Sequence, residues 1–245
     1  MTDSSDDRGE HATAGATPRP SPGFGGAVPT TNLDLLLATA VALGLPPAAA
    51  WLFDQTGGAL ASLALYYGVC CLGLVRWRKG TLDYRRPSPW PWAIFLPSLL
   101  LPLASAAINA GALPDSGGAP LGVALTLLVW APLNAAAEQC SWFYVLDAWR
   151  NRWPGGRRRL LATAVGVILL LLLVGLIHAL FWAKVLPVTE PTPLTRFAIP
   201  LNIVLTGANG LLYYRSRSMW PVFVVHLLVD AQLVLLAHYS ILPDL

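Results

Sequence analysis

The sequence predicts an all-α membrane protein, a polytopic transmembrane helical bundle of about seven spans with a cytoplasmic N-terminus. Of its 245 residues, 55% are hydrophobic and only 12% are charged, whereas a soluble domain carries about 25% charged residues. Uncharged runs recur along the chain, each about as long as a helix needs to cross a ~30 Å hydrocarbon core. The basic residues gather in a few loops. The composition excludes a disordered protein and disfavours a soluble enzyme.

The first element, residues 1–31, is rich in Ser, Thr, Gly, Pro and Asp and cannot bury enough apolar surface to fold. We expect a disordered cytoplasmic tail here, followed by a transmembrane helical domain over residues 32–245. The tail lacks the basic-then-apolar layout of a cleavable signal peptide, so the first helix is expected to be retained. The predicted spans are residues 33–53, 57–75, 89–110, 119–149, 160–184, 197–214 and 219–241.

Prolines mark two of these spans. Pro46 and Pro47 lie inside the first span and predict a kink, which neighbouring helices tolerate in a membrane. Pro132 lies inside the fourth span, which is predicted either as one tilted helix or as two short helices.

The basic residues set the predicted orientation. Of the sixteen Lys and Arg residues, all but Lys184 and Arg196 fall on one side of the membrane when the N-terminus is placed in the cytoplasm. This asymmetry is what the positive-inside rule predicts. Asp34 and Asp147 lie near span ends and are expected to be interfacial. Most tryptophans also lie near predicted helix ends, where an aromatic belt is expected: Trp51, Trp77, Trp90, Trp92, Trp149, Trp153, Trp182 and Trp220.

Four ionisable residues remain within the spans, where a charge costs roughly 2.5–3.5 kcal/mol at mid-helix. They are Glu138 in the fourth span, His178 in the fifth, and His226 with Asp230 in the seventh. His226 and Asp230 are four residues apart, so they share one helix face. At 1.5 Å per residue, Glu138 and Asp230 lie near the membrane midplane and His178 lies closer to the outer face. These residues meet only if they converge inside the bundle.

Polar residues accompany this set. Asn134, Glu138 and Ser141 form a stripe on one face of the fourth helix. Asn134 and Ser141 are expected to hydrogen-bond between helices. Asn202 and Asn209 in the sixth span are expected to be interhelical hydrogen-bonding or kink residues.

The four ionisable residues are suited to activating a water molecule for attack on a carbonyl group. No H-E-x-x-H motif, no G-x-S-x-G motif and no glycine-rich phosphate loop is present. A carboxylate or histidine can take a proton from water, and a second histidine can donate to the developing oxyanion. No cofactor is expected. Zn²⁺ held by Glu138, His178 and His226 is the alternative, because two histidines and a carboxylate leave an open coordination position.

The segment of residues 215–230 carries a family resemblance. Arg215-Ser-Arg-Ser-Met-Trp-Pro-Val-Phe-Val-Val-His226-Leu-Leu-Val-Asp230 closely resembles the last conserved block of the CPBP family. This family contains the type II CAAX prenyl endopeptidases and many bacterial relatives. Glu138 falls where the Glu-Glu-x-x-x-Arg block of the family begins, and His178 falls where its Phe-x-x-x-His block ends. The resemblance covers about residues 130–235.

The resemblance implies an intramembrane endopeptidase with a core of about residues 119–241, acting on a membrane-anchored polypeptide in the bilayer and not on nucleic acid. By this resemblance Glu138 is the base that activates water, His178 is its partner, and His226 with Asp230 stabilises the oxyanion. Bacterial relatives mature peptides, confer bacteriocin immunity or trim C-terminal anchors, as in the myxosortase branch. The richness in Ala, Pro and Arg is typical of a GC-rich bacterial genome, so the expected location is the bacterial inner membrane.

The sequence departs from the family pattern at three positions. The second Glu is Gln139, the expected Arg is Phe143, and the expected Phe is Val174. Gln139 still offers hydrogen bonds as a supporting residue but cannot act as a second base. The persistence of all four catalytic positions favours an active protease. The alternatives are a catalytically inactive family member that acts as a binding or bacteriocin-immunity protein, and a transporter or proton relay.

Overall fold

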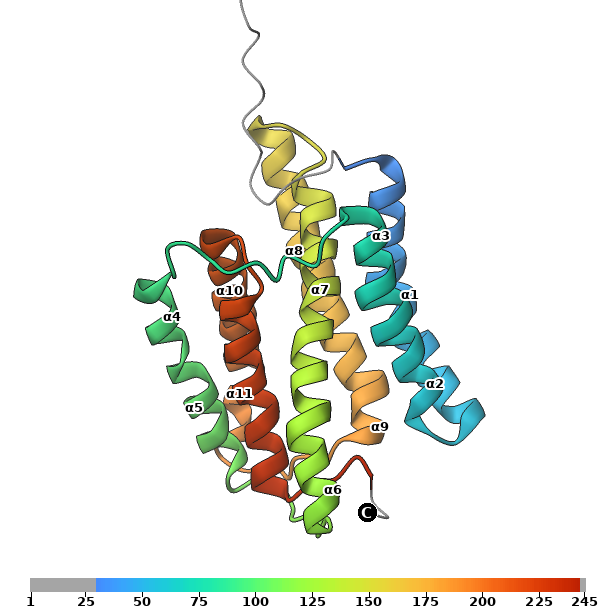
Figure 1. The fold of residues 1–245 in the computed structure, drawn as a ribbon, viewed down its shortest axis with the longest axis vertical. Coiled ribbons are helices and arrows are strands. Elements are labelled where there is room, and N and C mark those ends of the chain that lie inside the picture. The colour runs from blue at the N-terminus through green and yellow to red at the C-terminus, as the bar shows by residue number, and fades with distance from the viewer. Residues whose placement is uncertain (1–29, 243–245) are drawn as a thin grey trace, which may run out of the picture.

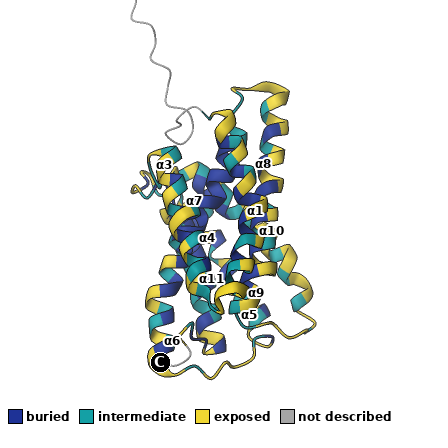
Figure 2. Cartoon of the chain, turned by 90° about the vertical axis from the view of Figure 1, so that its right-hand side faces the viewer, coloured by how far each residue is buried: buried dark blue, intermediate teal, exposed yellow. Residues whose placement is uncertain are grey.

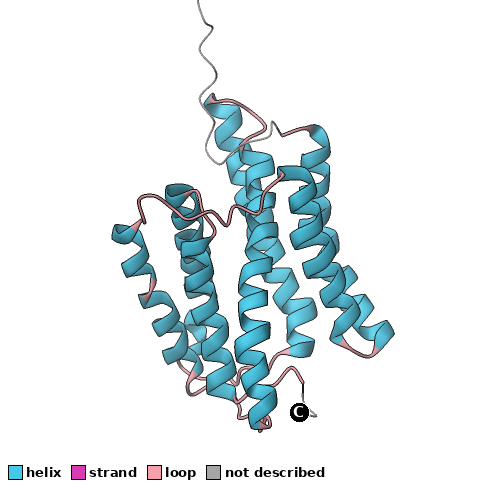
Figure 3. Cartoon of the chain, viewed as in Figure 1, coloured by secondary structure: helices cyan, strands magenta, loops and turns pink. Residues whose placement is uncertain are grey.

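The computed structural model describes residues 30–242, and within this range the regular elements are helices (Figure 3). The tail predicted over residues 1–31 lies, apart from its last two residues, outside the described range. Seven of the described helices are long and apolar enough to cross a membrane, which confirms the predicted integral membrane bundle. They are Asn32–Thr56, Ala59–Lys79, Trp92–Asn109, Pro120–Arg150, Gly156–Val185, Thr195–Ser216 and Trp220–Ala237.

Several spans are subdivided, because π-helical stretches and short breaks interrupt the α-helical hydrogen bonding. The first three spans comprise α1 (Asn32–Thr56), then α2 (Ala59–Leu63), the π-helical η1 (Ala64–Leu74) and α3 (Val75–Lys79), then α4 (Trp92–Ser98) and α5 (Leu100–Asn109). The fourth and fifth comprise α6 (Pro120–Leu125), the π-helical η2 (Thr126–Trp130) and α7 (Ala131–Arg150), then α8 (Gly156–Ile177), the π-helical η3 (His178–Trp182) and α9 (Ala183–Val185). The last two comprise η4 (Thr195–Phe197) with α10 (Ala198–Ser216), and α11 (Trp220–Ala237).

The prolines do not break their spans. α1 continues through Pro46 and Pro47. The fourth span is one continuous run, which settles the alternative left open at Pro132. That proline is the second residue of α7, which directly follows the π-helical η2, so the N–H that proline lacks falls where the hydrogen-bond pattern of the run changes.

α7 is the central helix of the bundle. It packs on α1, α8, α11 and η1, and Figure 1 shows it between α11 on one side and α3 with α1 on the other. Most residues of α7 from Asn134 to Ala148 are buried. Many large apolar residues of the surrounding helices are exposed, and Figure 2 shows exposed residues along the outer helices, as expected where lipid is the solvent. A polar residue on α7 is therefore held away from lipid on every side.

The outer helices form two groups around α7. α8 packs mainly on α7 and α1, whereas α10 packs mainly on α11, α4 and α5. Most arginines lie in or beside three connections, those between α3 and α4, between α7 and α8, and between α10 and α11. These connections lie at the same end of the bundle (Figure 1), which we call the arginine-rich end.

Candidate functional site

The site is built around a buried acid. Glu138 on α7 has an exposed fraction of 0%. Its Oε1 accepts a hydrogen bond from Nε1 of Trp182 at 2.8 Å. Its Oε2 has no hydrogen-bond partner among the described residues and lies 3.6 Å from Nε2 of His226. That separation is too long for a good hydrogen bond, so Oε2 keeps its capacity to accept a proton or a hydrogen bond from a small molecule.

His226 and Asp230 face the acid from α11. Nε2 of His226 lies 3.6 Å from Oδ1 of Asp230 as well as from Glu138, so this nitrogen sits between two carboxylates. The imidazole stacks on the ring of Trp142, with centroids 4.8 Å apart and planes inclined by 24°. Nδ1 of His226 is buried without a partner in the described part of the chain. The carboxylates favour the tautomer with its proton on Nε2, the nitrogen that faces Glu138 and Asp230.

Asn134 ties the cluster to two other helices. Its Nδ2 donates to Oδ2 of Asp230 at 2.9 Å, and its Oδ1 accepts from the Tyr67 hydroxyl on η1. Ser141 takes a different role, because its hydroxyl donates at 2.8 Å to the backbone carbonyl of Glu138. It also accepts from the Cys71 thiol at 3.4 Å. Asn134 therefore positions the aspartate, while Ser141 holds the backbone of α7 against η1.

His178 lies at the margin of the cluster. It is exposed, and its Nδ1 donates to the Val174 carbonyl at 2.8 Å. No described hydrogen bond joins it to Glu138, His226 or Asp230; its link to the acid runs along the helix, because Trp182, which donates to Glu138, lies four residues further on. Since a carbonyl only accepts, Nδ1 carries the proton and Nε2 is left as an acceptor. The structure brings three of the four predicted residues into one buried cluster and leaves the fourth on an exposed wall beside it.

Gln139 and Phe143, which replace family residues, point elsewhere. Nε2 of Gln139 contacts the hydroxyl of Tyr84 and the carbonyl of Met219, the latter at 3.4 Å. Phe143 stacks on Tyr213 with centroids 4.3 Å apart and planes inclined by 16°. Both side chains hold helices together and neither approaches Oε2 of Glu138. Gln139 thus offers hydrogen bonds to Tyr84 and Met219, and its role as a supporting residue stays a prediction.

Three aromatic residues of the site were missed by sequence reasoning. Trp182 was expected in the interfacial belt, but this is wrong: its exposed fraction is 2%, and its indole holds Glu138. A signal was present, because Trp182 lies four residues after His178 and so shares its helix face. Tyr67 and Trp142 carried no comparable signal. Tyr67 and Trp182 lie in π-helical segments η1 and η3, and such segments often occur at functional sites.

A metal site is not formed by the described side chains. Among residues 30–242, no group of three or more His, Cys, Asp or Glu side chains is arranged to hold a metal ion. The alternative zinc ligands Glu138, His178 and His226 accordingly form no such group here. Zinc dependence stays a prediction that experiment must test.

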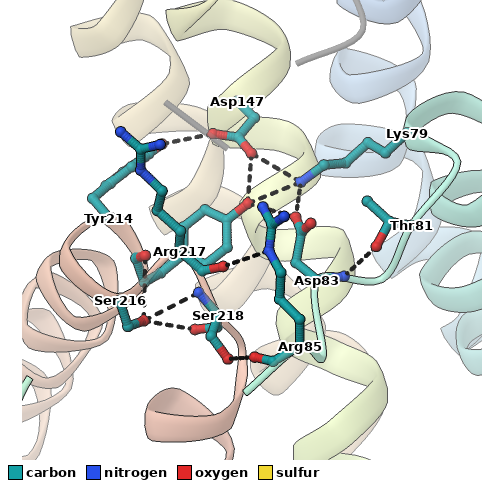
Figure 4. Close-up of polar contacts among 10 residues, drawn as sticks. Lys79, Thr81, Asp83, Arg85, Asp147, Tyr214, Ser216, Arg217 and Ser218 are labelled. Atoms are coloured by element: carbon teal, nitrogen blue, oxygen red, sulfur yellow. Dashed lines mark hydrogen bonds and ion pairs between the residues drawn. The ribbon is translucent and has the colours of Figure 1, made fainter. Parts of the chain in front are cut away.

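A second buried polar network lies at the arginine-rich end (Figure 4). Nζ of Lys79 contacts Oδ2 of Asp83, Oδ2 of Asp147 and the Tyr213 hydroxyl, each at 2.9 Å. The Tyr214 hydroxyl donates to Oδ1 of Asp147 at 2.9 Å. Asp147, expected near a span end, lies at this end of the bundle and is buried at the centre of the network, where Lys79 neutralises it.

The start of α11 is held in place by Ser218, whose bond to Arg85 Figure 4 shows, and by Trp220. The Ser218 hydroxyl donates to the Arg85 carbonyl at 2.6 Å and accepts from the Trp220 backbone N–H at 3.1 Å. The Trp220 indole donates to the Tyr84 carbonyl at 2.9 Å. These bonds bind α11 to the loop after α3, and so set the depth at which His226 and Asp230 lie.

Comparison with known proteins identifies one family. Residues 120–232 match the sequence model described as Rce1-like, type II CAAX prenyl endopeptidase. The match confirms the resemblance seen in the sequence, and it spans the four predicted catalytic positions. No curated protein and no solved structure matches the chain. The myxosortase branch stays a prediction.

Proposed function

Because residues 120–232 belong to the type II CAAX prenyl endopeptidase Rce1-like family, we propose that the chain is an intramembrane endopeptidase. It hydrolyses a peptide bond of a membrane-associated protein or peptide. The observation that carries the proposal is the buried Oε2 of Glu138, which has no hydrogen-bond partner in the described chain and faces Nε2 of His226 at 3.6 Å.

The proposed reaction uses water as the nucleophile. Glu138 takes a proton from a water molecule, and the hydroxide adds to the carbonyl carbon of the scissile bond. The carbonyl oxygen gains negative charge and accepts a hydrogen bond from Nε2–H of His226. When the tetrahedral intermediate collapses, the C–N bond breaks and the proton held by Glu138 passes to the departing amine. The water is thereby divided between a new carboxyl group and a new amino group.

The remaining residues position these two groups. Trp182 holds one oxygen of Glu138 so that the other faces His226. Asp230, itself held by Asn134, orients the imidazole. His178 is the partner of Glu138 on the exposed side, where its Nε2 can accept a hydrogen bond from water. The proposal places the arginine-rich end in the cytoplasm of a bacterium, with the chain in the inner membrane.

The test is a substitution that removes only the base. Glu138→Gln keeps an acceptor for Trp182 but cannot take a proton. Glu190→Gln, the same change on an exposed loop residue, is the matched control. Mass spectrometry of membrane and secreted polypeptides should show an uncleaved precursor accumulating with Glu138→Gln and not with Glu190→Gln, at equal protein abundance. If both variants process every polypeptide as the wild type does, the protein is an inactive family member and the proposal is wrong.

A further inference from the structure

A groove opens between the fifth and sixth spans, outside the buried cluster. It has a volume of about 610 Å³ and is lined by α8 and η3 on one side and α10 on the other. Most of its lining is apolar, with the polar side chains of His178, Asn202 and Thr206 among it. The groove exists because α8 packs mainly on α7 and α1, whereas α10 packs mainly on α11, α4 and α5.

α10 carries a polar stripe whose first two residues, Asn202 and Thr206, line this groove. Asn202, Thr206 and Asn209 are spaced by four and three residues, so they lie on one face of the helix. Nδ2 of Asn202 donates to the Ala198 carbonyl at 2.9 Å, and the Thr206 hydroxyl donates to the Asn202 carbonyl at 2.8 Å. Both bonds stay within α10, so the expected interhelical hydrogen bond of Asn202 is absent from the described contacts. Asn209 has an exposed fraction of 3%, and its Oδ1 has no described partner.

A stripe of polar side chains is energetically unfavourable in contact with lipid. Polar groups at membrane depth are costly unless they are paired or line a cavity; the Asn202 amide and the Thr206 hydroxyl donate within α10, but the Asn202 amide oxygen has no described partner and an acyl chain offers it no donor. An unwound stretch of polypeptide is also unfavourable in lipid, because its backbone N–H and C=O groups lack hydrogen-bond partners inside the bilayer. A peptide bond must leave its helix before water can attack the carbonyl. A groove with exposed amide and hydroxyl groups therefore suits an unwound peptide better than lipid.

We propose that this groove receives an unwound segment of a membrane-spanning polypeptide directly from the bilayer, with Asn202 and Thr206 hydrogen-bonding its backbone. The inference rests on the proposed peptidase function and names the route by which its substrate reaches the acid. His178 lies in the groove wall, four residues before Trp182, whose indole donates to Glu138, so it stands where the bound segment meets the catalytic cluster. Asn202 and Thr206 are positioning residues.

The test compares two adjacent positions on α10. Ile203 lines the groove and Val204 does not, yet their exposed fractions are 53% and 56%. Ile203→Cys and Val204→Cys are placed separately in full-length Glu138→Gln protein and reconstituted in liposomes. The probes are two synthetic Leu/Ala transmembrane peptides with one central cysteine, and one of them carries a Gly-Pro break beside it. The parent protein without an added cysteine gives the background from Cys70, Cys71 and Cys140.

We expect the broken probe to form more disulfide with Ile203→Cys than with Val204→Cys, because only Ile203 lines the groove; loss of one hydrogen bond from the groove should lower that yield about fivefold. The unbroken probe should show no preference. Asn202→Leu or the isosteric Thr206→Val, added to Ile203→Cys, should lower cross-linking of the broken probe alone. Equal yields at the two positions, or a preference for the unbroken probe, would overturn the inference.

The result is independent of the reaction itself, because the cross-linking protein lacks the base. If Glu138→Gln blocks processing but the two cysteine positions react equally, the peptidase stands and the groove is wrong. If processing never depends on Glu138 while Ile203→Cys still selects the broken probe, the groove binds unwound peptide and the hydrolytic proposal fails.

Discussion

The protein contains two buried polar clusters that differ in how completely their atoms are paired. Around Lys79, opposite charges and phenols meet at 2.9 Å. Around Glu138, the imidazole lies 3.6 Å from each of two carboxylates, and one carboxylate oxygen and one ring nitrogen have no described partner. Both clusters link the central helix α7 to its neighbours, so their difference does not arise from position in the bundle.

This difference in pairing distinguishes residues that stabilise the helix bundle from residues that are proposed to react. A buried charge whose partners are all in place holds helices together, and removal of one partner leaves an uncompensated charge. A buried acid with an unpaired oxygen costs stability, and such a cost is expected where the group performs a function. The Lys79 network is therefore interpreted as a structural clamp and the Glu138 cluster as the reactive centre.

The largest expected effect is on activity at Glu138. Glu138→Gln should lower peptide hydrolysis by about 10²–10⁴-fold, the range attributed to general-base catalysis. The melting temperature in detergent should not fall, because the substitution removes a buried charge and keeps the acceptor for Trp182. Cleavage assays and thermal unfolding of the same preparation measure both. A large loss of stability would place Glu138 with the structural network and remove the contrast between the clusters.

The opposite pattern is expected at Lys79. Lys79→Met should lower the free energy of unfolding by about 3–5 kcal/mol, since Asp83 and Asp147 would remain buried without their cation. The control is Lys184→Met, which breaks an ion pair with Asp54 whose side chains are 34% and 54% exposed; it should cost less than about 1 kcal/mol. Denaturant unfolding in detergent micelles measures both variants. Equal losses would show that burial of the network contributes nothing.

A smaller effect on activity and stability is expected at Trp182, whose indole donates a hydrogen bond to Glu138. Trp182→Phe removes the donor to Oε1 of Glu138 and should cost about 1–3 kcal/mol of stability, together with part of the activity. Trp149→Phe is the matched control, because Nε1 of Trp149 is also buried but has no described partner. It should cost less than Trp182→Phe and leave cleavage intact. Equal behaviour of the two variants would contradict a role for Trp182 in orienting the base.

No effect at all is expected from metal removal. If Glu138 activates water directly, incubation of purified protein with EDTA should leave the cleavage rate and the melting temperature unchanged. Elemental analysis of the same sample measures any bound zinc. Loss of activity on chelation, restored by Zn²⁺, would favour the alternative in which Glu138, His178 and His226 hold a metal.

Much of the fold follows from local sequence. All seven predicted spans occur, with ends shifted by a few residues, because an apolar stretch in lipid has to satisfy its own backbone hydrogen bonds as a helix. Glu138, His226 and Asp230 were identifiable because ionisable residues within a span are costly and therefore rarely accidental.

The sequence by itself determined the membrane class, the number of spans and the residues from which a catalytic cluster could be built. Only the tertiary structure decided that Trp182 turns inward to Glu138, that Gln139 turns away to Tyr84, and that His178 lies on an exposed groove wall. Hydropathy is summed along the chain and is blind to how a helix is rotated about its axis. That rotation depends on the packing of neighbouring helices and on the π-helical segments η1 and η3, where a local change of helical pitch redirects the side chains that follow.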